Sequence, residues 1–384
     1  MKRQAWNRAA KLLGAVTLAA VAASLVFGQV RQAEAGRRDQ ASVARMTQDM
    51  KTVCIGRFLI DLPQETRLEL RGPRIDGFDI SSFDEPEADF LNRLGQREAR
   101  LRTAPDQLGG NRNLEMVREV KTDNGVIGKI FVHGRTVREG TRSRGLELER
   151  YRFEHVAVEA LVHGKGMSFD LSAGKYDPDL IENLPKLVAK LVPNPDNLVP
   201  KEPGYCVHRA WFQDPLRADQ LEQIMMHAQL PDNPDIELMA VLAAGLTPDK
   251  QSLLERHAHT EAGLEPDAKK RVLNLRAAPR TIGDITGDEI VTRVVEINDS
   301  IGYSFWWEVA GTEDNVLVPH FVFKITTGEG NNGPVPSSLS QDAAIALWDK
   351  ISSSIRVHHA GQGKGANAFT PASASAKASR TPDA

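Results

Sequence analysis

The sequence predicts an α+β protein built from two tandem, duplicated domains, each an antiparallel sheet with helices on one face. Three observations carry this prediction: the length of 384 residues, one supersecondary plan that occurs twice, and strands that follow one another directly. At about 150 residues per domain, the length favours two globular domains. The steady strand–helix alternation of a parallel sheet is missing, so a doubly wound fold is disfavoured.

The first 35 residues have the pattern of an export signal. Basic residues precede an uninterrupted apolar run over 12–27, and Ala33, Glu34 and Ala35 give the small-x-small pattern that signal peptidase cleaves. An uncleaved anchor is the alternative, because this run falls just short of a membrane span. Removing its five Lys and Arg and its one Glu from the totals of 48 and 51 leaves a net charge of −7. In both cases we expect the body of the protein in the periplasm.

Residues 36–50 are polar and predict a tether or a frayed helix, which leads into domains at 51–198 and 199–358. The two domains open alike, at 53–63 and 204–215, with a cysteine, an arginine three positions later, an apolar pair and an Asp near a Pro. Short strands follow at 67–70 and 78–80 in the first domain, and at 236–242 in the second. Each leads to an amphipathic helix, over 87–102 and 248–262.

Glycine-containing turns come next, at 123–125 and 285–288, and Asn124-Gly125 is a strong hairpin signal. Two sets of strands are then predicted, over 146–162 and 167–171 in the first domain and over 290–297, 303–309 and 318–326 in the second. Helices over 177–191 and 340–354 close the two domains, and a linker, Pro193-Asn194-Pro195, separates them. The tail, 359–384, is rich in Ala, Ser, Gly, Lys and Pro, which predicts disorder.

No motif predicts catalysis, a bound cofactor or a metal. Ser168 follows Gly166 as in a nucleophile elbow, but Asp170 stands where the second glycine is needed. No complete phosphate-binding loop, His-Glu-x-x-His motif or calcium loop occurs. The near-neutral total charge of −3 gives no basic footprint for nucleic acid. We therefore expect a protein without enzymatic activity, and without a membrane span once the signal is removed.

Cys54 and Cys206 are the two cysteines of the chain. Outside the cytoplasm they could form one disulfide, or they could be two buried thiols that act as small apolar side chains. The sequence does not place their Cα atoms within bonding reach, so both alternatives stay open.

Three residues are candidates for contact with a partner. Trp306 lies in an aromatic strand on the face opposite Phe305 and Trp307, and tryptophan is enriched in binding hot spots. Asn331 and Asn332 lie in a long loop rich in Gly and Pro, a kind of segment that often carries recognition. The alternatives are a Trp306 packed beneath a helix and a loop that merely connects two elements.

The segment 54–63, directly after an export signal, resembles the opening of the periplasmic immunity proteins paired with type VI secretion lipase effectors of the fourth lipase group. Gly204-Tyr205-Cys206, followed by a helix and then by 230–236, is similar to the start of that family's second domain. The resemblance covers residues 50–358. It implies a two-domain α+β protein without catalysis that binds a phospholipase of α/β-hydrolase type in the periplasm and blocks its lipase site. It implies no cofactor, and it assigns no contact residues.

Two other functions compete with this one. An exported hydrolase would assemble its site from dispersed residues, and the missing motifs count against it. An envelope-assembly module would dock to other periplasmic proteins through its two domains.

Overall fold

The structure is a computed structural model that describes residues 36, 38–145, 147–214, 216, 220–313 and 315–358. The signal at 1–35 and the tail at 359–384 lie outside the described residues. The polar segment that follows the signal forms a helix over 38–46. Within the described residues, no helix combines the length and the apolar character that crossing a membrane requires.

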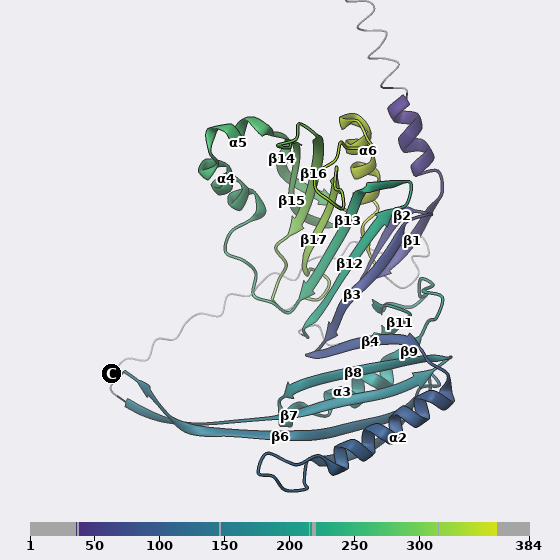
Figure 1. The fold of residues 1–384 in the computed structure, drawn as a ribbon, viewed down its shortest axis with the longest axis vertical. Coiled ribbons are helices and arrows are strands. Elements are labelled where there is room, and N and C mark those ends of the chain that lie inside the picture. Colours follow the sequence, from purple (N-terminus) through teal and green to yellow (C-terminus); the bar gives the residue numbers. More distant parts are fainter. Residues whose placement is uncertain are drawn as a thin grey trace, which may run out of the picture.

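In this part of the chain, twelve strands form one antiparallel sheet that runs through the whole molecule (Figure 1). Its order is β14-β15-β16-β17-β13-β12-β3-β4-β8-β7-β6-β5. The first-half strands are β3 (Arg67–Ile75), β4 (Phe78–Asp84), β5 (Leu114–Lys121), β6 (Ile127–Arg144), β7 (Glu147–Gly164) and β8 (Met167–Tyr176). The second-half strands are β12 (Glu222–Leu230), β13 (Asn233–Ala244), β14 (Val272–Ile282), β15 (Ile285–Val295), β16 (Ile301–Val309) and β17 (His320–Thr327).

The central pair of this sheet, β3 with β12, takes one strand from each half of the chain. Outward from β3 the sheet continues with β4, β8, β7, β6 and β5, and outward from β12 it continues with β13, β17, β16, β15 and β14. In each half the next strand along the chain therefore comes first, the last strand of that half comes second, and the others follow in reverse chain order. At the corner between β3 and β4 the two strands share only two residue pairs, Arg74 with Asp79 and Ile75 with Phe78. The sheet turns there, so the two halves meet at a large angle (Figure 1).

Two small sheets carry the cysteine-containing hairpins. The first hairpin is β1 (Met50–Ile55) with β2 (Phe58–Pro63), and the second is β10 (Gly204–Val207) with β11 (Ala210–Gln213). The third strand of each sheet comes from the far end of the other half. β18 (Arg356–Val357) pairs with β2, and β9 (Leu191–Pro193) pairs with β11. The halves therefore exchange their closing strands.

Helices cover both faces of the large sheet, so the expectation of helices on one face is wrong. In the first half, α2 (Glu87–Thr103) packs Phe90 on Leu161 of β7, whereas α3 (Asn183–Lys190) belongs to the main core with Val162. In the second half, α6 (Gln341–Ser352) stacks Trp348 on Phe305 of β16. The other face of β16 is bound by α4 (Leu253–Gly263), which α5 (Pro266–Arg271) follows. The physical reason is that central strands such as β7 carry apolar side chains on both faces.

One hydrophobic core extends through both halves. It includes Phe78 and Leu184 of the first half, and Leu238 and Trp348 of the second, all close to fully buried. The two expected domains therefore share a sheet and a core, and they are not two bodies joined by a linker.

Several expected elements are confirmed and others are corrected. The helix over 87–102, the Asn124-Gly125 turn and the strand over 236–242 are present. The helix expected between Cys206 and residue 230 is wrong, because Glu222–Leu230 form strand β12. The turn expected at 285–288 is wrong as well, since the chain reverses just before, at Gly283, with a φ of 57°. The second-half helix begins at Leu253, where Ser252 and Glu255 form a capping box.

Candidate partner-binding surface

Ser168, the candidate nucleophile in the sequence, is completely buried. Its hydroxyl donates to Glu85 and lies 3.2 Å from Nδ1 of His163. A catalytic triad needs the histidine between serine and carboxylate, and here the serine stands in the middle. The His163 ring also stacks on Phe90 of α2, with centroids 5.2 Å apart, so the helix covers this trio. It is a buried hydrogen-bonded network beneath α2.

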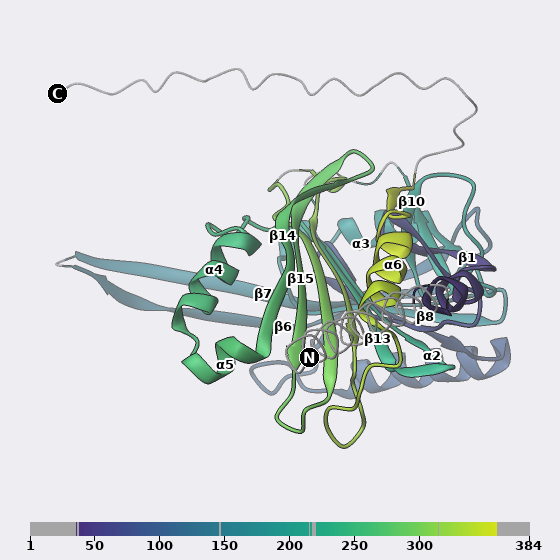
Figure 2. The same ribbon diagram turned by 90° about the horizontal axis from the view of Figure 1, so that it is seen from above.

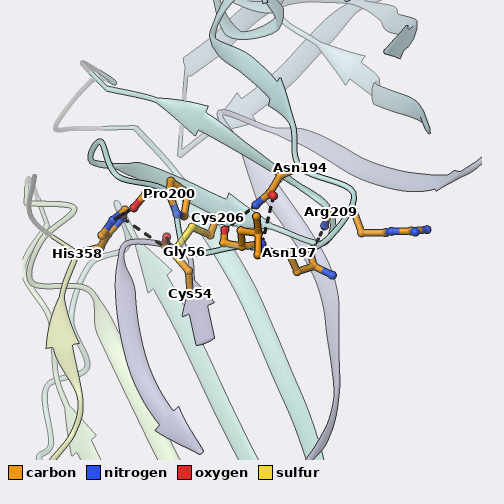
Figure 3. Close-up of a disulfide and its surroundings, with 9 residues drawn as sticks. Cys54, Gly56, Asn194, Asn197, Pro200, Cys206, Arg209 and His358 are labelled. Atoms are coloured by element: carbon orange, nitrogen blue, oxygen red, sulfur yellow. Dashed lines mark hydrogen bonds between the residues drawn. A yellow bond between two sulfur atoms is a disulfide. The ribbon is translucent and has the colours of Figure 1, made fainter. Parts of the chain in front are cut away.

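Cys54 and Cys206 form a disulfide between β1 and β10 (Figure 3). Their Cα atoms lie 5.8 Å apart. Two backbone hydrogen bonds between Gly56 and Cys206, at 2.8 and 3.0 Å, hold the two strands together beside the sulfur atoms. The bond therefore joins the first hairpin of one half to the first hairpin of the other.

His358 packs against this disulfide. Its Nε2 lies 2.9 Å from the Pro200 carbonyl oxygen, which fixes the ring so that Nδ1 points toward Cys54, 4.0 Å from Sγ. Among the described residues, Cys54, Cys206 and His358 are the one cluster whose ligand atoms converge as at a metal site. Both of its sulfur atoms are engaged in the disulfide.

Trp306 lies half-buried on the face of β16 that α4 also contacts. The ammonium of Lys324, on the neighbouring strand, is 3.2 Å from the centre of its ring. Burial lowers the pKa of Lys324, although the charge of Glu308 acts in the opposite direction. The indole Nε1 of Trp306 is buried and has no hydrogen-bond partner among the described residues. Trp306 is thus neither a fully packed core residue nor a fully exposed one.

A row of side chains continues from Trp306 across the sheet. The strand register aligns Trp306 with Lys324, Met239, His227 and Glu69, on β16, β17, β13, β12 and β3. Each of these side chains is half-buried or exposed. Figure 1 views this face, and no described element lies in front of β13, β12 and β3 there. This row is an uncovered strip of sheet with a mixed apolar and charged surface.

Asn331 and Asn332 lie exposed in the loop between β17 and α6. The loop is held at its base, because Asp235 accepts hydrogen bonds from the amides of Gly328 and Ser338 at 3.2 and 2.9 Å. No hydrogen bond or ion pair in the described chain links Trp306 to either asparagine. The structure therefore does not bring the three candidate residues into one cluster.

The most prominent exposed feature is the outer part of the hairpin β6–β7, which we call the arm and define as residues 136–155. Neither flanking strand pairs with it: β5 pairs with β6 only as far as His133, and β8 pairs with β7 only from Val156. Between Thr136 and His155 the two strands pair with each other alone. Figures 1 and 2 both show the arm extending beyond the body, on the side where α4 and α5 project.

The arm does not follow from the sequence pattern, because the outer half of β6 is polar and lacks the apolar alternation of a half-buried strand. A signal was present: both arginines and glutamates are frequent on each side of Gly145, whose φ is 67°. That pattern is typical of an exposed ribbon whose strands are joined by ion pairs across the pair.

Comparison with known proteins assigns the family. Residues 198–360 match the C-terminal domain of Tle cognate immunity protein 4, and residues 51–151 match its N-terminal domain. The chain belongs to this family. It is an immunity protein and not an enzyme.

Solved structures share the fold. The apo immunity protein TplEi of the type VI secretion system (T6SS) from Pseudomonas aeruginosa is 23% identical with a TM-score of 0.63, and the match covers 80% of this chain and 97% of that one. TplEi in complex with an "L" peptide is 22% identical with a TM-score of 0.62, over 80% and 98% of the two chains. A chain of the Tle4–Tli4 complex is 24% identical with a TM-score of 0.64, over 80% and 97%. Curated proteins give no match to this chain.

Proposed function

We propose that this protein is a periplasmic immunity protein that binds its cognate type VI lipase effector and blocks the lipase site. Membership of the Tle cognate immunity protein 4 family is the observation that carries the proposal. A protein of similar fold occurs in a complex named Tle4–Tli4. Binding of the effector protects the producing cell and its siblings from damage to their own membranes.

The location in the periplasm is supported by two features of the chain. The first 35 residues have the pattern of an export signal. The disulfide between Cys54 and Cys206 belongs to an oxidising compartment. The effector must be held there, because its lipid substrate lies at the membrane surface.

We infer that the effector is an α/β-hydrolase whose mobile lid is gripped, since a lipase that cannot open an apolar lid cannot reach lipid. A grip of this kind needs two projecting parts on one rigid frame. The arm and the α4–α5 helices project to the same side of this molecule. The shared sheet, the exchanged strands and the disulfide fix one half relative to the other. Asn331, Asn332 and the strip that includes Trp306 are the proposed further contacts.

We also propose that the two halves, 51–198 and 199–358, arose by duplication. The identical order of strands outward from β3 and β12 supports this, as does the reciprocal exchange of β9 and β18. An arginine is the second residue of each hairpin turn, and each reaches a carboxylate of the other half: Arg57 binds Asp214, and Arg209 binds Asp84 at 2.5 Å.

Co-expression tests the function. The lipase encoded in the same gene cluster, exported to the periplasm, is produced with the full chain, without it, and with the chain lacking residues 1–35. We expect growth and intact phospholipid only with the full chain. If the full, folded chain fails to rescue growth, this pairing is wrong. Rescue by the chain that lacks residues 1–35 would rule out the periplasmic location.

A further inference from the structure

The arm is a two-stranded ribbon that other strands do not support, and such a ribbon alone is marginally stable in water. Contacts at its base hold it in place. Gln107, in the loop after α2, makes two hydrogen bonds to the backbone of Val137, at 2.7 and 3.1 Å. Arg135 binds Glu115 at 2.6 Å and also binds Glu154. The base is therefore fixed to the body, and the arm leaves it in a defined direction.

Further contacts stiffen the arm along its length. Arg142 binds Glu149 at 3.0 Å and Arg152 binds Glu139 at 3.2 Å, each pair joining the two strands. Between these two ion pairs, the Tyr151 ring lies across Gly140, where a Cβ would come within 2.8 Å of the Tyr151 hydroxyl oxygen. An aromatic side chain over a strand glycine is a known device for holding a ribbon in register. The arm is pre-shaped before any partner arrives.

The arm nevertheless exposes large apolar side chains. Leu148 is 78% exposed and Phe153 is 50% exposed. Because successive side chains of a strand point to opposite faces, these two residues lie on opposite faces of the ribbon. A partner that covers both side chains must contact both faces of the ribbon. A groove does this, because its two walls lie on either side of what it holds.

The charges of the arm point to the chemistry of that groove. Five arginines and four glutamates lie in the arm, on a protein whose total charge is −3. In the described chain, Arg138, Arg144 and Arg150 have no carboxylate partner. Arg138 stands opposite Phe153 in the strand register, and Arg150 is two residues from Leu148 on the same face. Each face thus combines an unpaired arginine with an exposed apolar side chain.

We propose that the arm inserts into a groove of the cognate effector whose two walls each combine an apolar surface with carboxylates. This inference rests on the proposed function and names the surface that performs it. Arginine is suited to such walls, because its fork of N–H donors matches a carboxylate. An anionic membrane is disfavoured as the occupant, since the four glutamates interleaved with the arginines would be repelled by it.

The test is binding of the mature chain to the same lipase, made catalytically inactive, at two salt concentrations. We expect Arg138→Glu with Arg150→Glu to weaken binding at least about 100-fold, with a slower association rate that no longer depends on salt. The matched control is Arg100→Glu with Arg112→Glu, which makes the same change in charge at exposed sites outside the arm. We expect it to change affinity less than about 3-fold.

A variant with a shortened arm provides a second test of the inference, and this test does not depend on reversing a charge. Replacing 138–153 by Asn-Gly joins Val137 directly to its register partner Glu154 through a tight turn. We expect this variant to keep the Tm of the wild type and to lose lipase binding. We expect Phe153→Ala, also with an unchanged Tm, to lose most of the binding. If folded, shortened protein binds like the wild type, the inference is wrong while the proposed function stands. Arm-dependent binding to phosphatidylglycerol vesicles, with lipase binding intact, would assign the arm to the membrane instead. Absence of lipase binding by the wild type would refute the function itself.

Discussion

Arg57 and Glu222 form a buried ion pair that joins the two halves of the molecule. Arg57 lies in the turn of the first hairpin, and its guanidinium meets the carboxylate of Glu222, the first residue of β12, at 2.6 and 2.8 Å. Their side chains are 5% and 4% exposed. Burial raises the pKa of Glu222, although the hydrogen bonds and the charge of Arg57 oppose that shift. Each charge is therefore tolerated in the interior because the other is present.

Arg57→Ala should lower the free energy of unfolding by about 3–5 kcal/mol, because it leaves Glu222 buried without its counter-charge. The matched control is Arg71→Ala, which breaks an ion pair with Glu69 that lies on the surface. That change should leave the stability nearly unchanged. Urea unfolding of both variants measures the contrast, and similar losses in the two would show that the buried pair is not a special contributor.

The disulfide should stabilise the fold without being required to form it. Replacing both Cys54 and Cys206 by alanine should lower the free energy of unfolding by about 2–5 kcal/mol. The pairing of β3 with β12 and the exchanged strands are unaffected, so the circular dichroism spectrum should stay the same. Dithiothreitol should lower the Tm of the wild type and leave that of the double variant unchanged. A Tm of the double variant equal to that of the oxidised wild type would contradict this.

The contact of α4 with the sheet should weaken in acid. Burial disfavours the charged form of Glu308, but His320, whose Nε2 lies 3.6 Å from the carboxylate, and the hydrogen bond from Arg256 outweigh it, so the pKa of Glu308 is lowered from its ordinary value of 4.5. The unfolded chain then binds its proton at a higher pH than the folded chain does. The stabilisation is therefore present above pH 4.5 and is lost as the pH falls through the folded pKa.

Glu308→Gln should cost about 1.5–3 kcal/mol at pH 7, the usual contribution of a hydrogen bond to a charged group. Below the folded pKa the variant and the wild type should converge. Thermal unfolding between pH 3 and pH 7 measures the difference, with Glu69→Gln as the surface control. A difference in stability that does not change with pH would exclude ionisation of Glu308 as its cause.

The elements that could be predicted are those that leave a pattern within a short stretch of the sequence. The α2 helix follows from the helical spacing of Phe90, Leu94 and Leu101, and the β5–β6 turn follows from Asn124-Gly125. The strand β12 was missed because Met225, Met226 and their neighbours carry no strict alternation of apolar and polar side chains. It pairs with β13, which follows it directly, and with β3, more than 140 residues earlier in the chain, and no local pattern records the second partner.

The candidate surface was harder to predict than the fold. Trp306 could be placed on one face of its strand from the sequence. How far its ring is shielded from water depends on Lys324, which becomes its neighbour only because β16 pairs with β17. The arm depends on where β5 and β8 stop pairing, and the sequence of β6 and β7 does not contain that information. The exchange of β9 and β18 is likewise a property of the assembled fold.

Two neighbouring tryptophans should respond differently to replacement, one through the stability of the fold and the other through binding of the lipase. Trp307 is completely buried, and its Nε1 donates to the Arg280 carbonyl oxygen at 3.1 Å. Trp306 is half-buried on the opposite face, among the side chains of the uncovered strip. Trp307→Ala should therefore cost about 3–5 kcal/mol of stability through the cavity that it leaves.

Trp306→Ala should leave the Tm within a few degrees of the wild type and weaken lipase binding about 30-fold, as expected of a hot-spot tryptophan. Lys324→Met should weaken binding less, because it keeps the apolar stem that covers the indole ring and removes only the charge. Calorimetric titration with the inactive lipase, beside thermal unfolding of each variant, measures both quantities. If Trp306→Ala binds like the wild type, the strip lies outside the interface, and the contact with the effector is made by the projecting elements alone.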